Sequence, residues 1–226
     1  MDSCFLYRPQ GRQIPLIENV GDIRIDLGVC NANIAAGITD HLAAQAYAKY
    51  LDGHSHLQFA AGYYTQVGVR SVFEVYGGFS DMRGDGFFED DGGIDGDYID
   101  WHGGNIQTCF LQADYGVKHL GRGNMELGFA FRGGLMRYNV NIYGEQNYSY
   151  VGEDGRNHTD KIPYKDENYI GNTPYIEPSI MWRFGWNHFK FDIGASYGVA
   201  PGLPILHSGL KLSMGVCFDI DVFGDW

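Results

Sequence analysis

The chain has 226 residues, of which 44% are hydrophobic, and a net charge of −12 at pH 7. That charge argues against nucleic acid or an anionic membrane face as a partner, because both repel an acidic protein. The 33 glycines, 16 tyrosines and 14 phenylalanines are typical of strands and turns. The sequence has no apolar run of about eighteen residues, which excludes a membrane-spanning helix.

The first 20 residues show no periodicity and contain Pro9 and Pro15. They are predicted to form an extended leader (1–20) before a single β domain at 21–226. Cys4 is interpreted as the acylated residue of a bacterial lipoprotein, with an export signal expected upstream of Met1. The alternative for Cys4 is an ordinary cysteine near a start methionine.

Strands are indicated by period-two alternation of apolar and polar residues, which is clearest and unbroken near the end of the chain. Strands are predicted, in chain order, at residues 23–29, 33–38, 42–50, 57–64, 73–80, 108–117, 125–135, 176–184, 189–199 and 210–223. The second of these is short and weak, so eight strands is the alternative to ten. Pro178 lies within a predicted strand, where it costs a ladder hydrogen bond, and is expected to mark a bulge or to lie above a bilayer.

The connections alternate in length. Short turns are predicted near residues 40, 69, 121 and 187, and longer loops near 54, 94, 158 and 204. The two longest loops are expected at 84–104 and 144–172. Long loops on one rim and short turns on the other are typical of outer-membrane barrels. Both termini then lie on the short-turn, periplasmic side.

The two faces of the predicted strands differ in chemistry. The apolar faces are nearly free of charge and rich in aromatic residues, which are too bulky to fill a ten-strand lumen. An apolar face toward lipid requires a closed barrel, because every backbone group must then be paired within the sheet. The polar faces are predicted to form an interior network of Arg24, Asp26, Glu74, Asp114, Glu126, Arg132, Glu177, Arg183, Lys190 and Asp192. The alternative is a soluble barrel whose charges face water.

Two further features concern the ends and pairing of the strands. The aromatic residues Tyr50, Trp182, Phe184, Trp186 and Phe223 fall near strand ends and suit an interfacial girdle. Cys30 and Cys217 are predicted to lie on inward positions of the first and last strands, where a disulfide is one alternative and free buried thiols the other.

The loop near residue 94 is strongly acidic. Asp91, Asp95, Asp97 and Asp100 have a spacing that a calcium loop could use, although the register and terminal Glu of an EF-hand are absent. The alternative is a solvated acidic loop with no cofactor. Several histidines fall on the long-loop side, which invites comparison with omptin proteases, but no catalytic motif is visible.

The segment from Cys4 through Pro15-Leu16 and Gly21-Asp22 to the turn Thr39-Asp40-His41-Leu42 resembles a group of uncharacterised Bacteroidota surface proteins. This resemblance covers about residues 4–42 and implies an exported, lipoprotein-like outer-membrane barrel without a stated activity.

The sequence therefore predicts an all-β, up-and-down transmembrane barrel in the bacterial outer membrane, in contact with its lipid and with loops outside. We expect a non-enzymatic protein with an occluded polar interior that acts through its loops or as an accessory subunit with other envelope proteins. The alternatives are a soluble or periplasmic barrel that binds a small ligand or glycan, and an omptin-like surface hydrolase.

Overall fold

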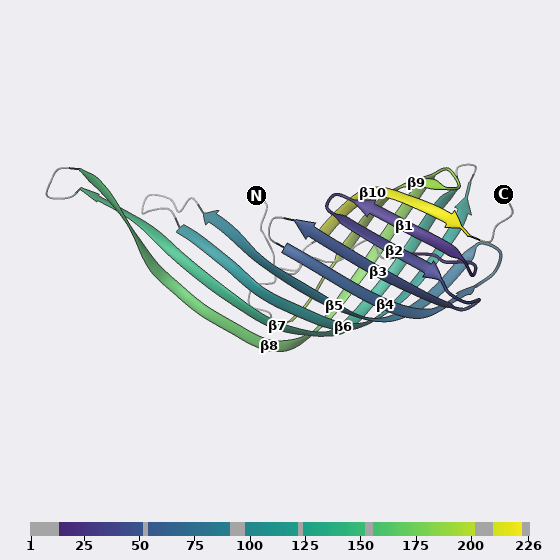
Figure 1. Ribbon diagram of the computed structural model, residues 1–226, viewed down its shortest axis with the longest axis horizontal. Coiled ribbons are helices and arrows are strands. Elements are labelled where there is room, and N and C mark those ends of the chain that lie inside the picture. The colour runs from purple at the N-terminus through teal and green to yellow at the C-terminus, as the bar shows by residue number, and fades with distance from the viewer. Residues whose placement is uncertain are drawn as a thin grey trace.

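A computed structural model describes residues 14–51, 54–90, 98–121, 124–151, 156–201 and 210–222. The fold is a closed antiparallel barrel in which each strand pairs with its neighbours in the chain and β1 pairs with β10 (Figure 1). The strands are β1 (Asp22–Gly28), β2 (Asn31–Gly37), β3 (Leu42–Leu51), β4 (His54–Gln66), β5 (Ser71–Asp90), β6 (Tyr98–Leu120), β7 (Met125–Val151), β8 (Asn157–Gly185), β9 (Phe189–Tyr197) and β10 (Leu210–Asp221). The predicted ten-stranded barrel is confirmed, and the eight-stranded alternative is wrong.

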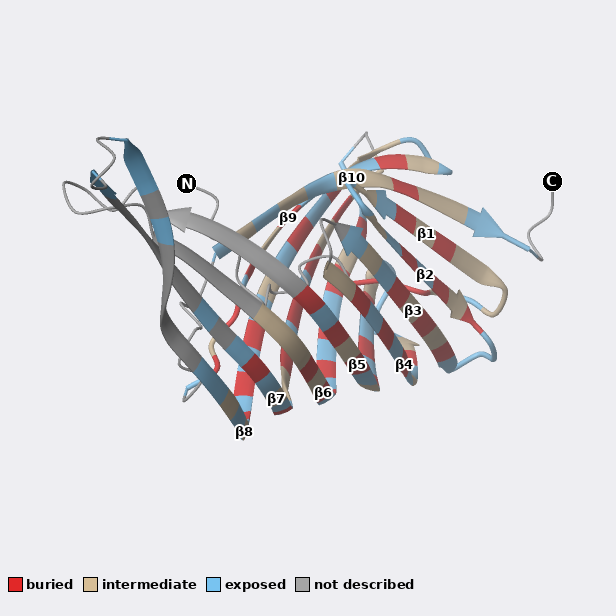
Figure 2. Ribbon diagram, turned by 60° about the vertical axis from the view of Figure 1, so that its left-hand side comes forward, coloured by how far each residue is buried: buried red, intermediate tan, exposed pale blue. Residues whose placement is uncertain are grey.

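Buried and exposed residues alternate along the barrel strands, and the polarity is the reverse of that in a soluble protein (Figure 2). In β9, Lys190 and Asp192 are 4% and 2% exposed, whereas their neighbours Phe191 and Ile193 are 43% and 47% exposed. Side chains of successive residues in a strand point to opposite faces, so the charged residues line the lumen, together with buried residues such as Tyr64, Tyr76 and Ile106, and the exposed apolar residues form the outer wall.

Three tight turns lie at one rim, and the β1–β2 and β3–β4 connections at the opposite rim are also short. Residues 38–41, 67–70 and 186–188 form tight turns, with backbone hydrogen bonds from Val67 to Ser71 (2.7 Å) and from Trp186 to Phe189 (2.8 Å). The backbone N–H of Val222 donates to Gly21 O (3.2 Å), which places the start of β1 and the end of β10 at this same short-turn rim. The short turns predicted near residues 40, 69 and 187 are therefore confirmed at this rim, whereas the longer loop predicted near residue 54 is wrong, because β3 ends at Leu51 and β4 begins at His54.

Four strands extend well beyond the barrel. β5, β6, β7 and β8 have 20, 23, 27 and 29 residues, whereas β1 has 7 and β4 has 13. Their distal parts form a twisted sheet that projects away from the short-turn rim (Figure 1), which we call the extension. The long loops predicted at 84–104 and 144–172 are therefore wrong for most of their length, because 84–90, 98–104, 144–151 and 157–172 are strand.

Two prolines of β8, Pro174 and Pro178, are placed where they cost no ladder bond to β7. Ile176 and Val199 exchange two backbone hydrogen bonds of 2.9 Å, so even-numbered residues here direct their N–H groups away from β7. Pro178 and Pro174 share that direction. The continuous β8–β9 ladder begins at Ser179, just after Pro178. Pro178 therefore interrupts the β8–β9 ladder and leaves the β7–β8 ladder continuous, without a bulge. The register shift between β7 and β8 lies instead at Gly144/Glu145.

Candidate functional site

Residues 14–20, which we call the strap, cross the lumen close to the short-turn rim. Ile14, Leu16 and Ile17 are each no more than 1% exposed. The side chain of Ile14 lies against Gly128 of β7, and Ile17 lies against Gly37 of β2. These two strands are five places apart in the ten-strand ring, so the strap spans the full width of the barrel.

Glycines on the inner wall make room for the strap. A Cβ atom at Gly116 of β6 would lie 2.3 Å from the Leu16 side chain, and one at Gly37 would lie 2.3 Å from the carbonyl oxygen of Asn19. Either clash would force the strap or the wall to move. The inner wall is therefore shaped to this segment.

Buried charged side chains of the barrel bind the strap backbone. The Glu74 carboxylate accepts hydrogen bonds from the N–H groups of Leu16 (3.0 Å) and Ile17 (2.8 Å), one on each oxygen. Lys118 donates to the Leu16 carbonyl (3.3 Å). Arg24 donates to the carbonyl of Pro15. Charged partners make stronger hydrogen bonds than neutral ones, so three strands hold the strap through its backbone.

The end of the strap is fixed as it enters β1. Asp22 accepts hydrogen bonds from the backbone N–H groups of Glu18 (3.0 Å) and Asn19 (2.9 Å). The Glu18 carboxylate forms an ion pair of 2.7 Å with Lys118. Gly21 donates from its N–H to Gly37 O (2.9 Å). The strap is thus bonded both to the wall it crosses and to the strand it joins.

Next to the strap, one group of charged side chains is centred on Glu126, which is 1% exposed. Its carboxylate lies 3.2 Å from Arg24, 3.5 Å from Arg183 and 2.9 Å from Lys190. Two further carboxylates balance these cations: Asp26 lies 2.9 Å from Arg183, and Asp219 pairs with Arg24 and Lys190. We call this set of six side chains the arginine cluster. Buried charges of one sign are costly unless paired, and here three cations meet three anions.

A second polar group lies on the β4–β7 side of the lumen. Gln112 donates to both oxygens of Asp114 (2.9 and 2.8 Å) and accepts from Arg132 Nε (2.8 Å). Arg132 also donates to Gln58 (3.2 Å) and lies 4.4 Å from the Phe110 ring centroid. The second group therefore joins strands β4, β6 and β7 and packs against an aromatic ring.

The structure places all ten residues of the predicted interior network in the interior, each no more than 4% exposed. Arg24, Asp26, Glu126, Arg183 and Lys190 come together in the arginine cluster, and Asp114 and Arg132 come together in the second group. Glu74 binds the strap instead. Glu177 and Asp192 are buried, at 4% and 2% exposed.

Sequence reasoning missed the strap and Lys118. The strap has no periodicity, and its hydrogen bonds with Glu74 and Lys118 join residues 57 to 102 positions apart in the chain. Lys118 was detectable, because it continues the inward alternation of Gln112, Asp114 and Gly116 by one step beyond the predicted strand end at 117.

Of the two alternatives for Cys30 and Cys217, the structure favours free thiols over a disulfide, and the predicted inward position of Cys30 is wrong. Cys30 and Cys217 are free thiols. Cys30 lies exposed in the β1–β2 turn with a φ of 60°, whereas Cys217 is buried in β10. Cys217 points inward because it follows the alternation of β10. The alternation of β1 does not reach Cys30, because β1 ends at Gly28.

Two other predictions, acylation of Cys4 and the calcium loop, fall on residues about which the structure gives no side-chain description. Cys4, Asp91, Asp95 and Asp97 lie outside the described residues, and only the backbone of Asp100, in β6, is described. Among the side chains that are described, no three His, Cys, Asp or Glu residues are grouped as metal ligands.

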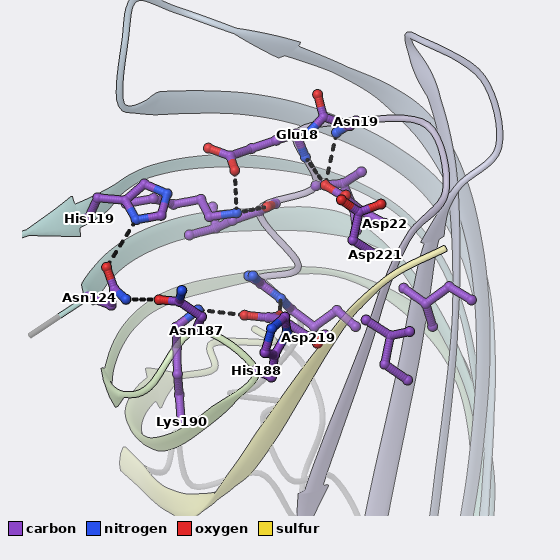
Figure 3. A pocket seen from close by; sticks show the side chains of 16 residues that line it. Glu18, Asn19, Asp22, His119, Asn124, Asn187, His188, Lys190, Asp219 and Asp221 are labelled. Atoms are coloured by element: carbon purple, nitrogen blue, oxygen red, sulfur yellow. Dashed lines mark hydrogen bonds and ion pairs between the residues drawn. The ribbon is translucent and has the colours of Figure 1, made fainter. Parts of the chain in front are cut away.

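A polar cavity of about 190 Å³ lies beside the strap at the short-turn rim (Figure 3). Lys190 and Asp219, which line it, form an ion pair, and Asn124 bonds to Asn187, so the turns before β7 and β9 are joined. His119 lies 3.3 Å from Asn124, between Nδ1 and Oδ1. The strap, with hydrogen bonds and ion pairs within the rim, lies across this mouth of the barrel.

The fold and its interior define the class of protein: a ten-stranded antiparallel barrel with an apolar outer wall and a charged lumen filled at one end by its own chain. Comparisons with protein-family models, with curated proteins and with solved structures give no match. The described residues include no helix long and apolar enough to cross a bilayer.

Proposed function

We propose that this chain is an outer-membrane β-barrel with an occluded lumen, and that it acts through the extension, alone or as an accessory subunit of an envelope complex. The observation that carries the proposal is the outer wall. Phe131, Leu111 and Leu135 are 55%, 69% and 66% exposed and belong to a continuous apolar surface around the barrel. Monomeric soluble proteins rarely expose large contiguous apolar surfaces, whereas a barrel in lipid requires one.

The height of this apolar surface supports a membrane placement. On β7 the outward residues are apolar or glycine from Leu127 to Leu135 and polar from Arg137 to Asn141. With a strand rise of about 3.4 Å and a tilt of about 40°, such a stretch covers roughly 20–25 Å, close to the apolar band of outer-membrane barrels. We call this surface the belt.

Aromatic residues at the lower edge of the belt support the same placement. Phe189 lies 6.2 Å from Trp186, 5.2 Å from Phe191 and 5.3 Å from Phe218, between ring centroids. Trp186 itself is 69% exposed at the short-turn rim. Amphipathic rings gather at membrane–water interfaces, so this group suits a periplasmic girdle. Tyr50, 70% exposed at the opposite end of β3, suits the outer girdle, while Phe223 lies outside the described residues.

The filled lumen supports a function other than transport through the barrel. The strap and the arginine cluster fill the short-turn half of the lumen. The charges of the cluster pair with one another, and Glu18 of the strap pairs with Lys118. A role in surface contacts then falls to the extension. A periplasmic binding barrel would carry the opposite arrangement, apolar inside and polar outside, so the observed faces disfavour that alternative. Membership of the Bacteroidota group and acylation of Cys4 stay predictions.

The test is expression with an added export signal, followed by electrophoresis of the outer-membrane fraction with and without boiling. We expect the protein in that fraction, with an unboiled band that migrates differently because a closed barrel resists detergent. Vesicles containing the purified protein should show no ion conductance above empty vesicles. A soluble protein without a mobility shift would contradict the membrane placement, and steady conductance would contradict occlusion.

A further inference from the structure

The outer surface changes from apolar to polar in a single step across all four long strands. The last row of the belt pairs Phe79, Cys109, Leu135 and Pro174 side by side on β5, β6, β7 and β8. The next outward row pairs Asp81, Gln107, Arg137 and Asn172, and the one above it pairs Arg83, Asn105, Asn139 and Ile170. We call these two rows the amide band.

The amide band is organised by one carboxylate. Asp81 accepts hydrogen bonds from Arg83 (2.7 Å), Asn105 (3.1 Å) and Gln107 (3.1 Å). Desolvation raises the pKa of Asp81, but these three hydrogen bonds and the Arg83 charge outweigh it and lower the pKa. The Asp81 carboxylate therefore stays ionised, and the charge of Arg83 balances it. Its hydrogen bonds fix the orientation of the Asn105 and Gln107 side-chain amides.

The β7 and β8 half of the amide band offers polar groups to a ligand. Arg137, Asn139 and Asn172 are all exposed. Across four strands the band is roughly 15 Å wide. Side-chain amides bind hydroxyl groups as donors and as acceptors, and arginine binds phosphate through paired N–H groups. The band thus combines groups for sugar hydroxyls with cations for phosphates.

Its position determines which ligand can reach it. The band faces sideways from the outer wall, directly above the belt, so in a membrane it lies at the depth of the outer-leaflet headgroups. We propose that the amide band binds the phosphorylated sugar headgroup of an outer-leaflet glycolipid. The inference rests on the proposed membrane placement. A phospholipid headgroup is smaller than the band and offers few hydroxyl groups, so the number of amides favours a glycolipid.

The test uses the full chain folded into phosphatidylcholine vesicles, with and without a short-core lipopolysaccharide. The temperature at which the unboiled band converts to the boiled form is measured as glycolipid is added. We expect lipopolysaccharide to raise this temperature by several degrees, and the variant R137A/N139A/N172A to need at least tenfold more for the same shift. Phosphatidylglycerol, which has a phosphate but no sugar, should give little shift.

A matched control removes similar groups from the opposite rim. The variant Q66A/R70A changes an exposed amide and an exposed guanidinium at the short-turn end and should respond as the unmodified chain does. An equal response of R137A/N139A/N172A, or an equal shift with phosphatidylglycerol, would overturn the inference while the protein remained inserted. Failure of the unmodified chain to insert would instead overturn the membrane placement, and with it the inference.

Discussion

Phe131→Arg is expected to lower the free energy of unfolding of the membrane-inserted protein by about 2–4 kcal/mol. Phe131 lies outward at the middle of the belt on β7 and is 55% exposed. An arginine there would place its charge in hydrocarbon. The measurement is a urea titration of protein folded into vesicles, followed by the unboiled band.

Asn139→Arg is the matched control, since Asn139 is also outward and exposed on β7 but lies above the belt. This change should alter the free energy of unfolding by no more than about 0.5 kcal/mol. If the outer wall faced water, both positions would be solvated surface sites and the two substitutions would have similar small effects. Equal values for the two variants would therefore contradict a lipid-facing belt.

Glu74→Ala is expected to release the strap from the lumen. The substitution removes the acceptor for the N–H groups of Leu16 and Ile17, and a hydrogen bond to a charged group contributes about 1.5–3 kcal/mol. The readout is labelling of Ile17→Cys by a water-soluble maleimide, in a chain whose four native cysteines are replaced by serine. The labelling rate should rise at least about tenfold with Glu74→Ala, given that difference in free energy.

Val69→Cys serves as the reference for this experiment. Val69 is 97% exposed in the β4–β5 turn, so its cysteine should label rapidly whether or not Glu74 is present. Glu74→Gln keeps one acceptor oxygen and should give an intermediate rate at Ile17→Cys. An unchanged rate at Ile17→Cys in a barrel that still shows the heat-dependent mobility shift would mean that Glu74 does not hold the strap.

The barrel and its charged interior follow from the sequence because both depend on a local pattern. In a strand, alternation alone assigns each side chain to one of two faces, and residues such as Arg183 and Asp192 share their face with neighbours of the same kind. Which charges meet is set by pairing between strands. The contact of Arg183 with Asp26 joins residues 157 positions apart, and no local pattern specifies it.

The extension was predicted as loop for a related reason. Above the belt the alternation on β7 changes sides: Met136 and Val140 are apolar and buried, whereas Arg137, Asn139 and Asn141 are polar and exposed. The apolar outer face therefore ends near residue 135 although the strand continues, because alternation reports which face is apolar rather than where a strand ends. The ladder between β7 and β8 continues to the pair Val151 and Asn157.

The strap escaped prediction because its short apolar run, which Pro15 interrupts, has no period. Ile14, Leu16 and Ile17 are packed by glycines and held through their backbone by side chains from other strands. A segment whose backbone partners are distant side chains leaves little trace in its own sequence.

The most direct test of the membrane placement is a spin-label scan along β7, one residue at a time from 127 to 143, in vesicles. Collisions of each label with oxygen, which concentrates in lipid, are compared with collisions with a water-soluble nickel reagent. We expect odd positions from 127 to 135 to favour oxygen, even positions to be shielded from both, and odd positions from 137 onward to favour nickel. Nickel access at odd positions from 127 to 135 would show that the belt faces water and would contradict the account.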